Sequence, residues 1–223
     1  MRGTGVLGFL TVVATVAVGW SETPPAPANS AATAIAAYPG MTIYQGTTIC
    51  TMGYADAASG LAFSAGHCNT DPVVRDEAGD YVGQVITSRH DPPGKIPSGP
   101  RDVVIDYEVI RLATGVEALD RALPDFVPPV QAQPAIRPEP GMRVCHIGAA
   151  TGSSCGEVSA VYAGWFTMNG RNIKSFAGDS GGPVLALLPN KDPALVGIFR
   201  GTSGPNLAAT TWADIVADAG LAT

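Results

Sequence analysis

The sequence predicts an all-β fold of two antiparallel β barrels lying side by side, followed by a short C-terminal helix. Glycine (27) and proline (19) are frequent among the 223 residues, and only 14% are charged. Long surface helices need many charged residues, so this balance favours short strands joined by turns. The strand-like runs fall into two groups of similar size, separated by a proline-rich segment. We therefore expect two barrels.

The expected strands are short apolar runs bounded by Gly, Pro, Asn or Asp, several with the alternation of half-buried strands. They cover residues 47–54, 60–64, 81–87, 103–111, 143–147, 156–162, 183–188 and 195–200. Residues 91–100 hold four prolines and two glycines, which predicts an exposed loop. Only residues 211–219 have helical periodicity, with Trp212, Ile215 and Val216 on one face.

The N-terminus has the pattern of an export signal. Arg2 precedes an apolar run over residues 6–18, and small residues Ala17 and Gly19 favour cleavage after Gly19. The run is shorter than the roughly 20 apolar residues that span a bilayer. The alternative is an uncleaved signal anchor.

The segments that follow differ in composition. Residues 20–37 are mostly Pro, Ala, Ser and Thr, with little to bury. The expected parts are a signal peptide over 1–19, a Pro/Ala-rich spacer over 20–37, and a folded domain over 38–223, with a first barrel over 38–123, a linker over 124–140, and a second barrel with the helix over 141–223.

The net charge and the cysteines indicate which partners are unfavourable and whether the protein carries disulfides. The formal net charge of −6 makes nucleic acid an unfavourable partner, because phosphate backbones repel an acidic chain. Four cysteines in an exported chain suggest disulfides and allow three pairings. The local pairing, Cys50–Cys68 and Cys145–Cys155, closes two short loops. A zinc site is disfavoured, because the neighbouring His and Cys residues at 67–68 and 145–146 lack the usual ligand spacing.

The segment Gly178-Asp179-Ser180-Gly181-Gly182-Pro183 has the features of a nucleophile turn. A serine hydroxyl needs a base to take its proton, and glycines permit a tight turn that presents backbone N–H donors. The α/β-hydrolases share a Gly-x-Ser-x-Gly pattern, but there the catalytic histidine follows the serine. All three histidines here precede Ser180. A subtilisin-like order is also disfavoured, because only Asp56 precedes His67.

Two further segments complete a candidate triad. His67, in Phe63-Ser64-Ala65-Gly66-His67-Cys68, can accept the serine proton. Asp106 begins an apolar strand and can orient the imidazole and stabilise the imidazolium. Asp102 is the rival carboxylate. His90 and His146 lack a comparable setting.

These segments together resemble the chymotrypsin-like serine proteases, and within them the bacterial streptogrisin and α-lytic protease group. The order His67, Asp106, Ser180 is that family's order. Cys50-Thr51-Met52-Gly53-Tyr54 and residues 144–156 (VCHIGAATGSSCG) are similar to two further segments of the bacterial group.

The resemblance implies two six-stranded-type barrels with the active site between them. It also implies an oxyanion hole from the N–H groups of Gly178 and Ser180. Residues expected to contact substrate are Lys174, at the base of the specificity pocket, and Arg200, Gly201 and Thr202 on a peptide-binding strand. Lys174 would disfavour cleavage after Lys or Arg.

Three departures from the family pattern bear on the site. Animal-type members begin with Ile-Val-Gly-Gly, whose new amino group pairs with the residue matching Asp179, and no such start exists here. Arg200 stands where the family has a serine. The bacterial branch places an arginine at the position of His146, so we expect a protonated His146, or Arg143, to pair with Asp179. A neutral His146 bonded to a backbone carbonyl is the alternative.

The sequence thus predicts a secreted, monomeric serine endopeptidase acting on protein or peptide through an acyl-enzyme on Ser180. His67 would be the general base and Asp106 would orient it. We expect no metal, no organic cofactor, no nucleic acid, and no stable membrane association once the signal is cleaved. Two alternatives stay open: a protease-like binding or regulatory protein with little turnover, and an esterase on the same fold.

Overall fold

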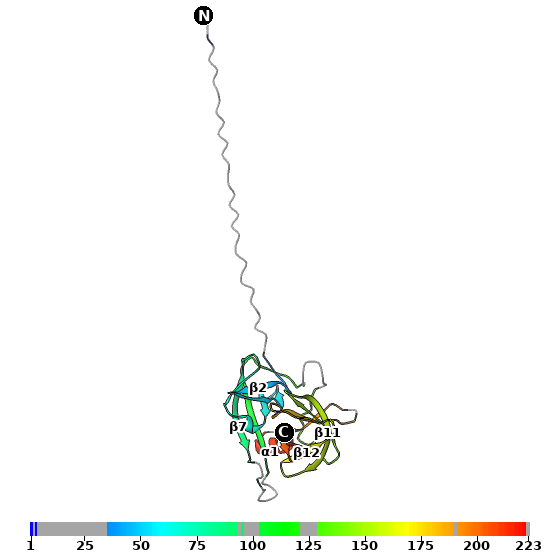
Figure 1. Cartoon of the computed structure of the whole chain (residues 1–223). Coiled ribbons are helices and arrows are strands. Elements are labelled where there is room, and N and C mark those ends of the chain that lie inside the picture. The colour runs from blue at the N-terminus through cyan, green and yellow to red at the C-terminus, as the bar shows by residue number, and fades with distance from the viewer. Residues whose placement is uncertain are drawn as a thin grey trace. The chain divides into compact units, whose positions relative to one another are not determined.

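The computed structural model describes Met1, Gly3 and residues 35–92, 95, 103–120, 129–189 and 191–221. Residues 34–223 form one compact unit (Figure 1). Most of the expected signal peptide and spacer, and the rival carboxylate Asp102, lie outside the described residues. No helix in the described ranges is long and apolar enough to cross a membrane.

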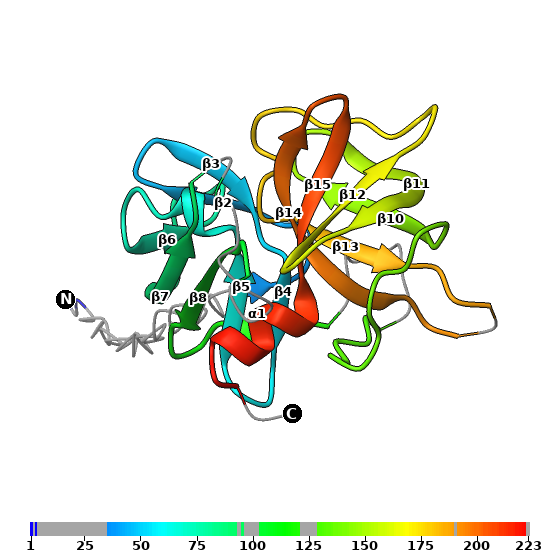
Figure 2. The ribbon, with the colours of Figure 1, turned by 90° about the horizontal axis from the view of Figure 1, so that it is seen from below.

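The first half is an antiparallel sheet of seven strands in the order β3-β2-β6-β7-β8-β5-β4 (Figure 2). Its edge strands β3 and β4 are joined only by Met52 and Gly53, so the sheet curls until its edges approach each other. The strands are β2 (Thr42–Gln45), β3 (Thr48–Thr51), β4 (Tyr54–Asp56), β5 (Leu61–Ser64), β6 (Val73–Arg75), β7 (Tyr81–His90) and β8 (Asp106–Leu112). Alternate side chains enclose a core of small and aliphatic residues, including Ile43, Met52, Val74, Val82 and Ile110.

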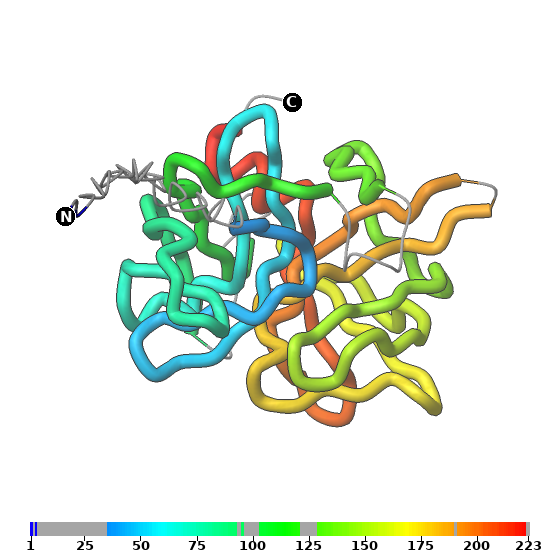
Figure 3. Tube along the Cα trace, turned by 90° about the horizontal axis from the view of Figure 1, so that it is seen from above, coloured from blue at the N-terminus to red at the C-terminus, as the bar shows by residue number. Residues whose placement is uncertain are grey.

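The second half is a closed six-stranded barrel in the order β10-β11-β12-β15-β14-β13. Its strands are β10 (Arg143–Gly148), β11 (Gly152–Val161), β12 (Trp165–Asn169), β13 (Pro183–Ala186), β14 (Ala194–Ser203) and β15 (Asn206–Thr211). Its interior is filled by apolar side chains such as Phe166, Met168, Val196 and Phe199. Figure 3 shows the two halves side by side: most of the blue-to-green trace lies in the first, and most of the yellow and orange trace lies in the second.

Helix α1 (Trp212–Asp218) follows β15 directly and packs back on the first half. The Trp212 ring makes edge-on contacts with Tyr54, at 5.7 Å between centroids, and with Phe63, at 4.9 Å. Ile215 and Val216 lie in the same core cluster. The prediction of an all-β fold with a C-terminal helix is therefore confirmed, and this helix helps to join the two halves.

Two details differ from the expectation. The seven-stranded sheet of the first half is not a closed six-stranded barrel, because no ladder joins β3 to β4. The folded part also begins before residue 38: β1 (Ala36–Ala37) pairs in parallel with β9 (Glu117–Ala118), and Ala37 is fully buried. An alanine-rich segment can form this short strand because its small side chains fit against a packed surface.

The described part of the expected linker also contributes to the core. Val130 is buried in the cluster that contains Trp212, and Gln131 bridges to Ala194 of β14. Val130 N–H donates to the Asp120 carbonyl, and Gln131 exchanges backbone hydrogen bonds with Pro193 and Leu195, so this segment is bonded to both halves.

Candidate active site

His67 lies on a short 3-10 turn, Gly66–Cys68, between β5 and β6. A side chain at Gly66 would overlap the carbonyl oxygens of Arg89 and Tyr107, so only glycine lets the turn lie against β7 and β8. The Cys50–Cys68 disulfide ties the turn to β3. The ring of His67 is thereby held at the start of β8, where Asp106 lies.

Asp106 accepts two hydrogen bonds from the same histidine. Its Oδ1 receives the backbone N–H of His67 at 2.9 Å, and its Oδ2 lies 2.7 Å from His67 Nδ1. The carboxylate is 1% exposed, and Thr210 Oγ1 fixes its backbone by donating to the Asp106 carbonyl at 3.0 Å. This leaves His67 Nε2 as the ring nitrogen available for proton transfer.

Ser180 lies in the nucleophile loop, which we define as residues 176–182. Gly178 (φ +104°) and Gly181 (φ +89°) adopt backbone conformations that favour glycine. A side chain at Gly181 would overlap Ser64 Oγ and the Thr51 carbonyl. The loop is therefore in direct contact with the segment that leads into His67.

Thr51, at the end of β3, holds the nucleophile loop in place. Its N–H donates to the Ser180 carbonyl at 2.7 Å, and its hydroxyl donates to the Gly178 carbonyl at 2.7 Å. The same hydroxyl accepts the Ala149 N–H at 2.9 Å. One residue of the first half thus positions the loop of the second half, a role that we did not predict for it.

The N–H groups of Gly178 and Ser180 donate no hydrogen bond to any residue that the structure describes. Their neighbours in the loop are satisfied: Asp179 N–H donates to Phe176, and Gly181 N–H donates to Phe199. Across the described residues, Ser180 Oγ and His67 Nε2 are not hydrogen-bonded to each other. Catalytic hydrogen bonds are often long without substrate and shorten when it binds.

Asp179 is buried, yet its partners are neutral. Its carboxylate accepts hydrogen bonds from Ala150 N–H (2.9 Å), Thr151 N–H (3.0 Å), Thr151 Oγ1 (2.8 Å) and Phe176 N–H (2.7 Å). The expectation of a charged His146 or Arg143 as partner is wrong. Four donors aimed at one carboxylate replace the hydration that a cation would otherwise compensate.

His146 instead matches the alternative of a neutral ring bonded to a carbonyl. Its Nε2 lies 2.7 Å from the Lys174 carbonyl oxygen, and its ring stacks on Phe199. Burial lowers the pKa of His146, against smaller opposite effects of the Lys174 carbonyl and Asp179. The ring is fully buried and part of the second barrel.

The residues expected to contact substrate lie in different settings. Lys174 is exposed, and its backbone is bonded to His146 and Ser154. Arg200, Gly201 and Thr202 lie on β14, where Arg200 Nε is 3.9 Å from Asp106 Oδ2. Arg200 and Thr202 line the same cavity as His67. Lys174 does not line that cavity.

His90, which the sequence did not single out, lies beside His67 with 5.5 Å between ring centroids. It is the cross-strand partner of Asp106, and only the pairing of β7 with β8 reveals that His90 lies at this site.

Atoms of His67, His90 and Asp106 lie within 4.8 Å of one another, close enough to share a metal ion. Metal binding is opposed by the hydrogen bond between His67 and Asp106 and by the Arg200 cation. The sulfurs of Cys50 and Cys68, which also lie near His67, are joined to each other.

Comparison with known proteins places the chain among relatives of unassigned role. No family model matches it. An uncharacterised protein of Mycobacterium tuberculosis, found in strains CDC 1551 and H37Rv, is 38% identical over 205 residues, covering 92% of this chain and 89% of the relative. The chain belongs to the same family as this mycobacterial protein. The family relationship itself names no activity.

This chain shares its fold with solved structures of chymotrypsin-like serine proteases, several of them bacterial. Cellulomonas bogoriensis chymotrypsin matches with a TM-score of 0.60 and 22% identity, over 83% of this chain and 97% of that one. A scabies mite inactivated protease paralogue matches with a TM-score of 0.53 and 15% identity, over 82% of this chain and 93% of the paralogue. At these identities the likeness establishes the fold, so activity has to be argued from the site.

Proposed function

We propose that the protein is a secreted serine endopeptidase that cleaves peptide bonds through an acyl-enzyme on Ser180. The observation that carries this proposal is the buried Asp106 held on His67 by two hydrogen bonds, beside a loop that presents Ser180. The Cys50–Cys68 and Cys145–Cys155 disulfides agree with an oxidising compartment.

The chemistry follows from the atoms present. His67 Nε2 takes the Ser180 hydroxyl proton while Oγ attacks the substrate carbonyl carbon. Asp106 keeps the Nδ1 proton in place and stabilises the imidazolium that forms. The unused N–H donors of Gly178 and Ser180 supply the oxyanion hole for the tetrahedral intermediate. The imidazolium then protonates the leaving amine, and water hydrolyses the acyl-enzyme by the same steps.

One specific feature favours the second candidate, a protease-like binding protein with little turnover. Arg200 lies against Asp106, where its positive charge competes with the imidazolium for the same carboxylate. The experiment must therefore distinguish a protein with a reactive Ser180 from one that has the fold but an unreactive serine.

The test is labelling with a fluorophosphonate, followed by mass spectrometry of the labelled peptide. We expect one labelled serine, Ser180, and loss of labelling in Ser180→Ala. Ser59→Ala is the matched control, because Ser59 is an exposed serine in the turn between β4 and β5. Peptide and ester substrates then distinguish the endopeptidase from an esterase. Absence of labelling in the purified wild-type protein would support the binding protein.

A further inference from the structure

A cavity of about 480 Å³ opens beside His67, on the side that Arg200 faces. Its lining combines ring and apolar surfaces with hydroxyl and cationic groups. Among the described residues, Ser180 does not line it. The cavity is therefore a site next to the reacting serine rather than the position of the scissile bond.

More basic than acidic side chains line the cavity. The Arg200 guanidinium is permanently charged. Lys95 also lines the cavity, with its ammonium 3.2 Å from Asp91. Asp106 is the only carboxylate among the lining residues described, and it is 1% exposed and already bonded to His67. An anion entering this space meets cations without a competing exposed carboxylate.

Arg200 is the group with unused bonding capacity. Its side chain is only 13% exposed, and it makes no hydrogen bond to the residues that the structure describes. At 3.9 Å its Nε is too far from Asp106 Oδ2 for a hydrogen bond. Its guanidinium carbon lies 6.0 Å from the centroid of the Trp165 ring, within the range of a cation–π contact.

A guanidinium with free donors is matched best by a planar carboxylate, which can accept two parallel hydrogen bonds. The hydroxyl groups of Thr202 and Ser203 line the same cavity and can donate further bonds. We propose that this cavity binds the carboxylate of an acidic substrate side chain, with Arg200 as its anchor. This proposal rests on the proposed function, because it takes the bound ligand to be a peptide substrate.

The consequence is a preference for peptides with Glu or Asp close to the scissile bond. Binding of such a side chain also gives Arg200 a carboxylate partner other than Asp106. A neutral isostere such as glutamine would leave the guanidinium donors poorly matched.

The test uses Ser180→Ala protein, which binds peptides without cutting them, and a positional library of N-acetylated, C-amidated hexapeptides with Glu or Gln at each position. Fluorescence polarisation measures the affinities. We expect at least tenfold tighter binding of the Glu peptide at one position, and loss of that preference when Arg200→Gln is added. Arg111→Gln, an exposed residue of β8, is the matched control and should keep the preference. Arg200→Lys, with thermal unfolding checked for each variant, should keep part of it.

Equal affinity for Glu and Gln peptides at every position would overturn the inference, as would a preference that persists in Arg200→Gln. A preference only for peptides with a free C-terminal carboxylate would also overturn it, because the bound anion would then be a chain end. Labelling of Ser180 without discrimination contradicts this inference alone. Discrimination without labelling of the wild-type protein contradicts the proposed function alone.

Discussion

Gln45 Nε2 donates a 2.6 Å hydrogen bond to Glu108 Oε1 inside the first half of the protein. Both side chains are buried, and Glu108 lies two residues along β8 from Asp106. Among the residues that the structure describes, none is a hydrogen-bond partner of Gln45 Oε1 or Glu108 Oε2. Burial raises the pKa of Glu108 to about 8, with a smaller contribution from Asp106 and an opposing one from Gln45.

Glu108 should make stability depend on pH. In the unfolded chain this carboxyl loses its proton near its ordinary pKa of 4.5, whereas the folded protein keeps it until about 8. The folded state thus binds more protons between these values, and the free energy of unfolding should fall as pH rises, by at most about 1.4 kcal/mol per pH unit. Urea unfolding of wild type and Glu108→Gln from pH 4 to 9 measures this.

For Glu108→Gln, the free energy of unfolding should change less with pH, and above pH 7 this variant should be more stable than the wild type. Glu117→Gln changes an exposed glutamate on β9 and serves as the matched control, with the wild-type slope retained. Parallel profiles for wild type and Glu108→Gln would contradict a proton held by the buried carboxyl.

His146 should make the free energy of unfolding decrease as the pH falls below neutrality. Because burial lowers its pKa in the folded state, the unfolded chain takes up this proton first as pH falls through about 6.5. Stability should therefore decrease below that pH until the folded ring is protonated as well. His146→Gln should reduce the acid-side loss between pH 4.5 and 6.5, measured by urea unfolding. His90→Gln, which removes an exposed histidine, should not.

Thr151 should support the nucleophile loop through Asp179. Thr151→Val removes the hydroxyl that donates to Asp179 Oδ2 at 2.8 Å and leaves a buried carboxylate oxygen with one donor fewer. We expect a loss of about 1–3 kcal/mol in unfolding free energy and slower fluorophosphonate labelling. Thr151→Ser keeps the hydroxyl and should restore most of both. Unchanged labelling in the Val variant would show that the hydrogen bond from Thr151 to Asp179 does not support the nucleophile loop.

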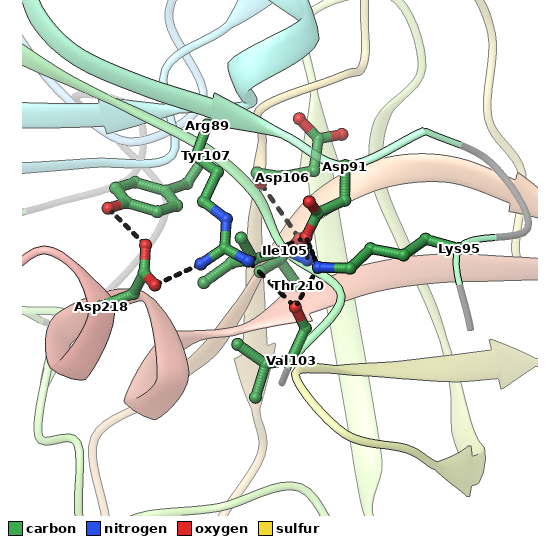
Figure 4. A network of polar contacts seen from close by, with 9 residues as sticks. All are labelled: Arg89, Asp91, Lys95, Val103, Ile105, Asp106, Tyr107, Thr210 and Asp218. Carbon is green, nitrogen blue, oxygen red and sulfur yellow. Dashed lines mark hydrogen bonds and ion pairs between the residues drawn. The ribbon is translucent and has the colours of Figure 1, made fainter. Parts of the chain in front are cut away.

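Tyr107 should anchor helix α1 to the strand that carries Asp106. Its hydroxyl donates to Asp218 Oδ2 at 2.9 Å, and Asp218 also pairs with Arg89 of β7 (Figure 4). Burial, and then the bond to Asp218, raises the pKa of Tyr107 far above its usual range, so the hydroxyl stays protonated.

Replacing Tyr107 with Phe should lower the free energy of unfolding by about 1 kcal/mol, the net contribution of one hydrogen bond, as measured by chemical denaturation. Asp214→Asn is the control: it loosens only the pair with Arg137, which is 60% exposed, and should change stability little. Equal effects of both substitutions would mean that the buried network adds nothing beyond a surface ion pair.

Local pattern was enough to predict some features and not others. His67, Asp106 and Ser180 stand in short segments whose chemistry is readable without the fold, and both disulfides close short loops. Strands such as β15, with the sequence Asn-Leu-Ala-Ala-Thr-Thr, carry little local signal, because their small side chains are selected by packing inside a barrel. Thr151 stands in the segment that is similar to the bacterial group, but only the fold shows that its N–H and hydroxyl donate to Asp179.

The hydrogen bonds to Asp179 bear on whether the proposed activity requires a proteolytic activation step. In the animal-type proteases that the sequence resembles, a cut creates the amino group that pairs at the matching position. Here all four donors, from Ala150, Thr151 and Phe176, are internal to the folded chain. The proposed activity would therefore need no such cut to order the nucleophile loop, because these donors are already in place. Any restraint on the proposed activity would then have to act elsewhere, for example at the cavity beside His67 or on Arg200.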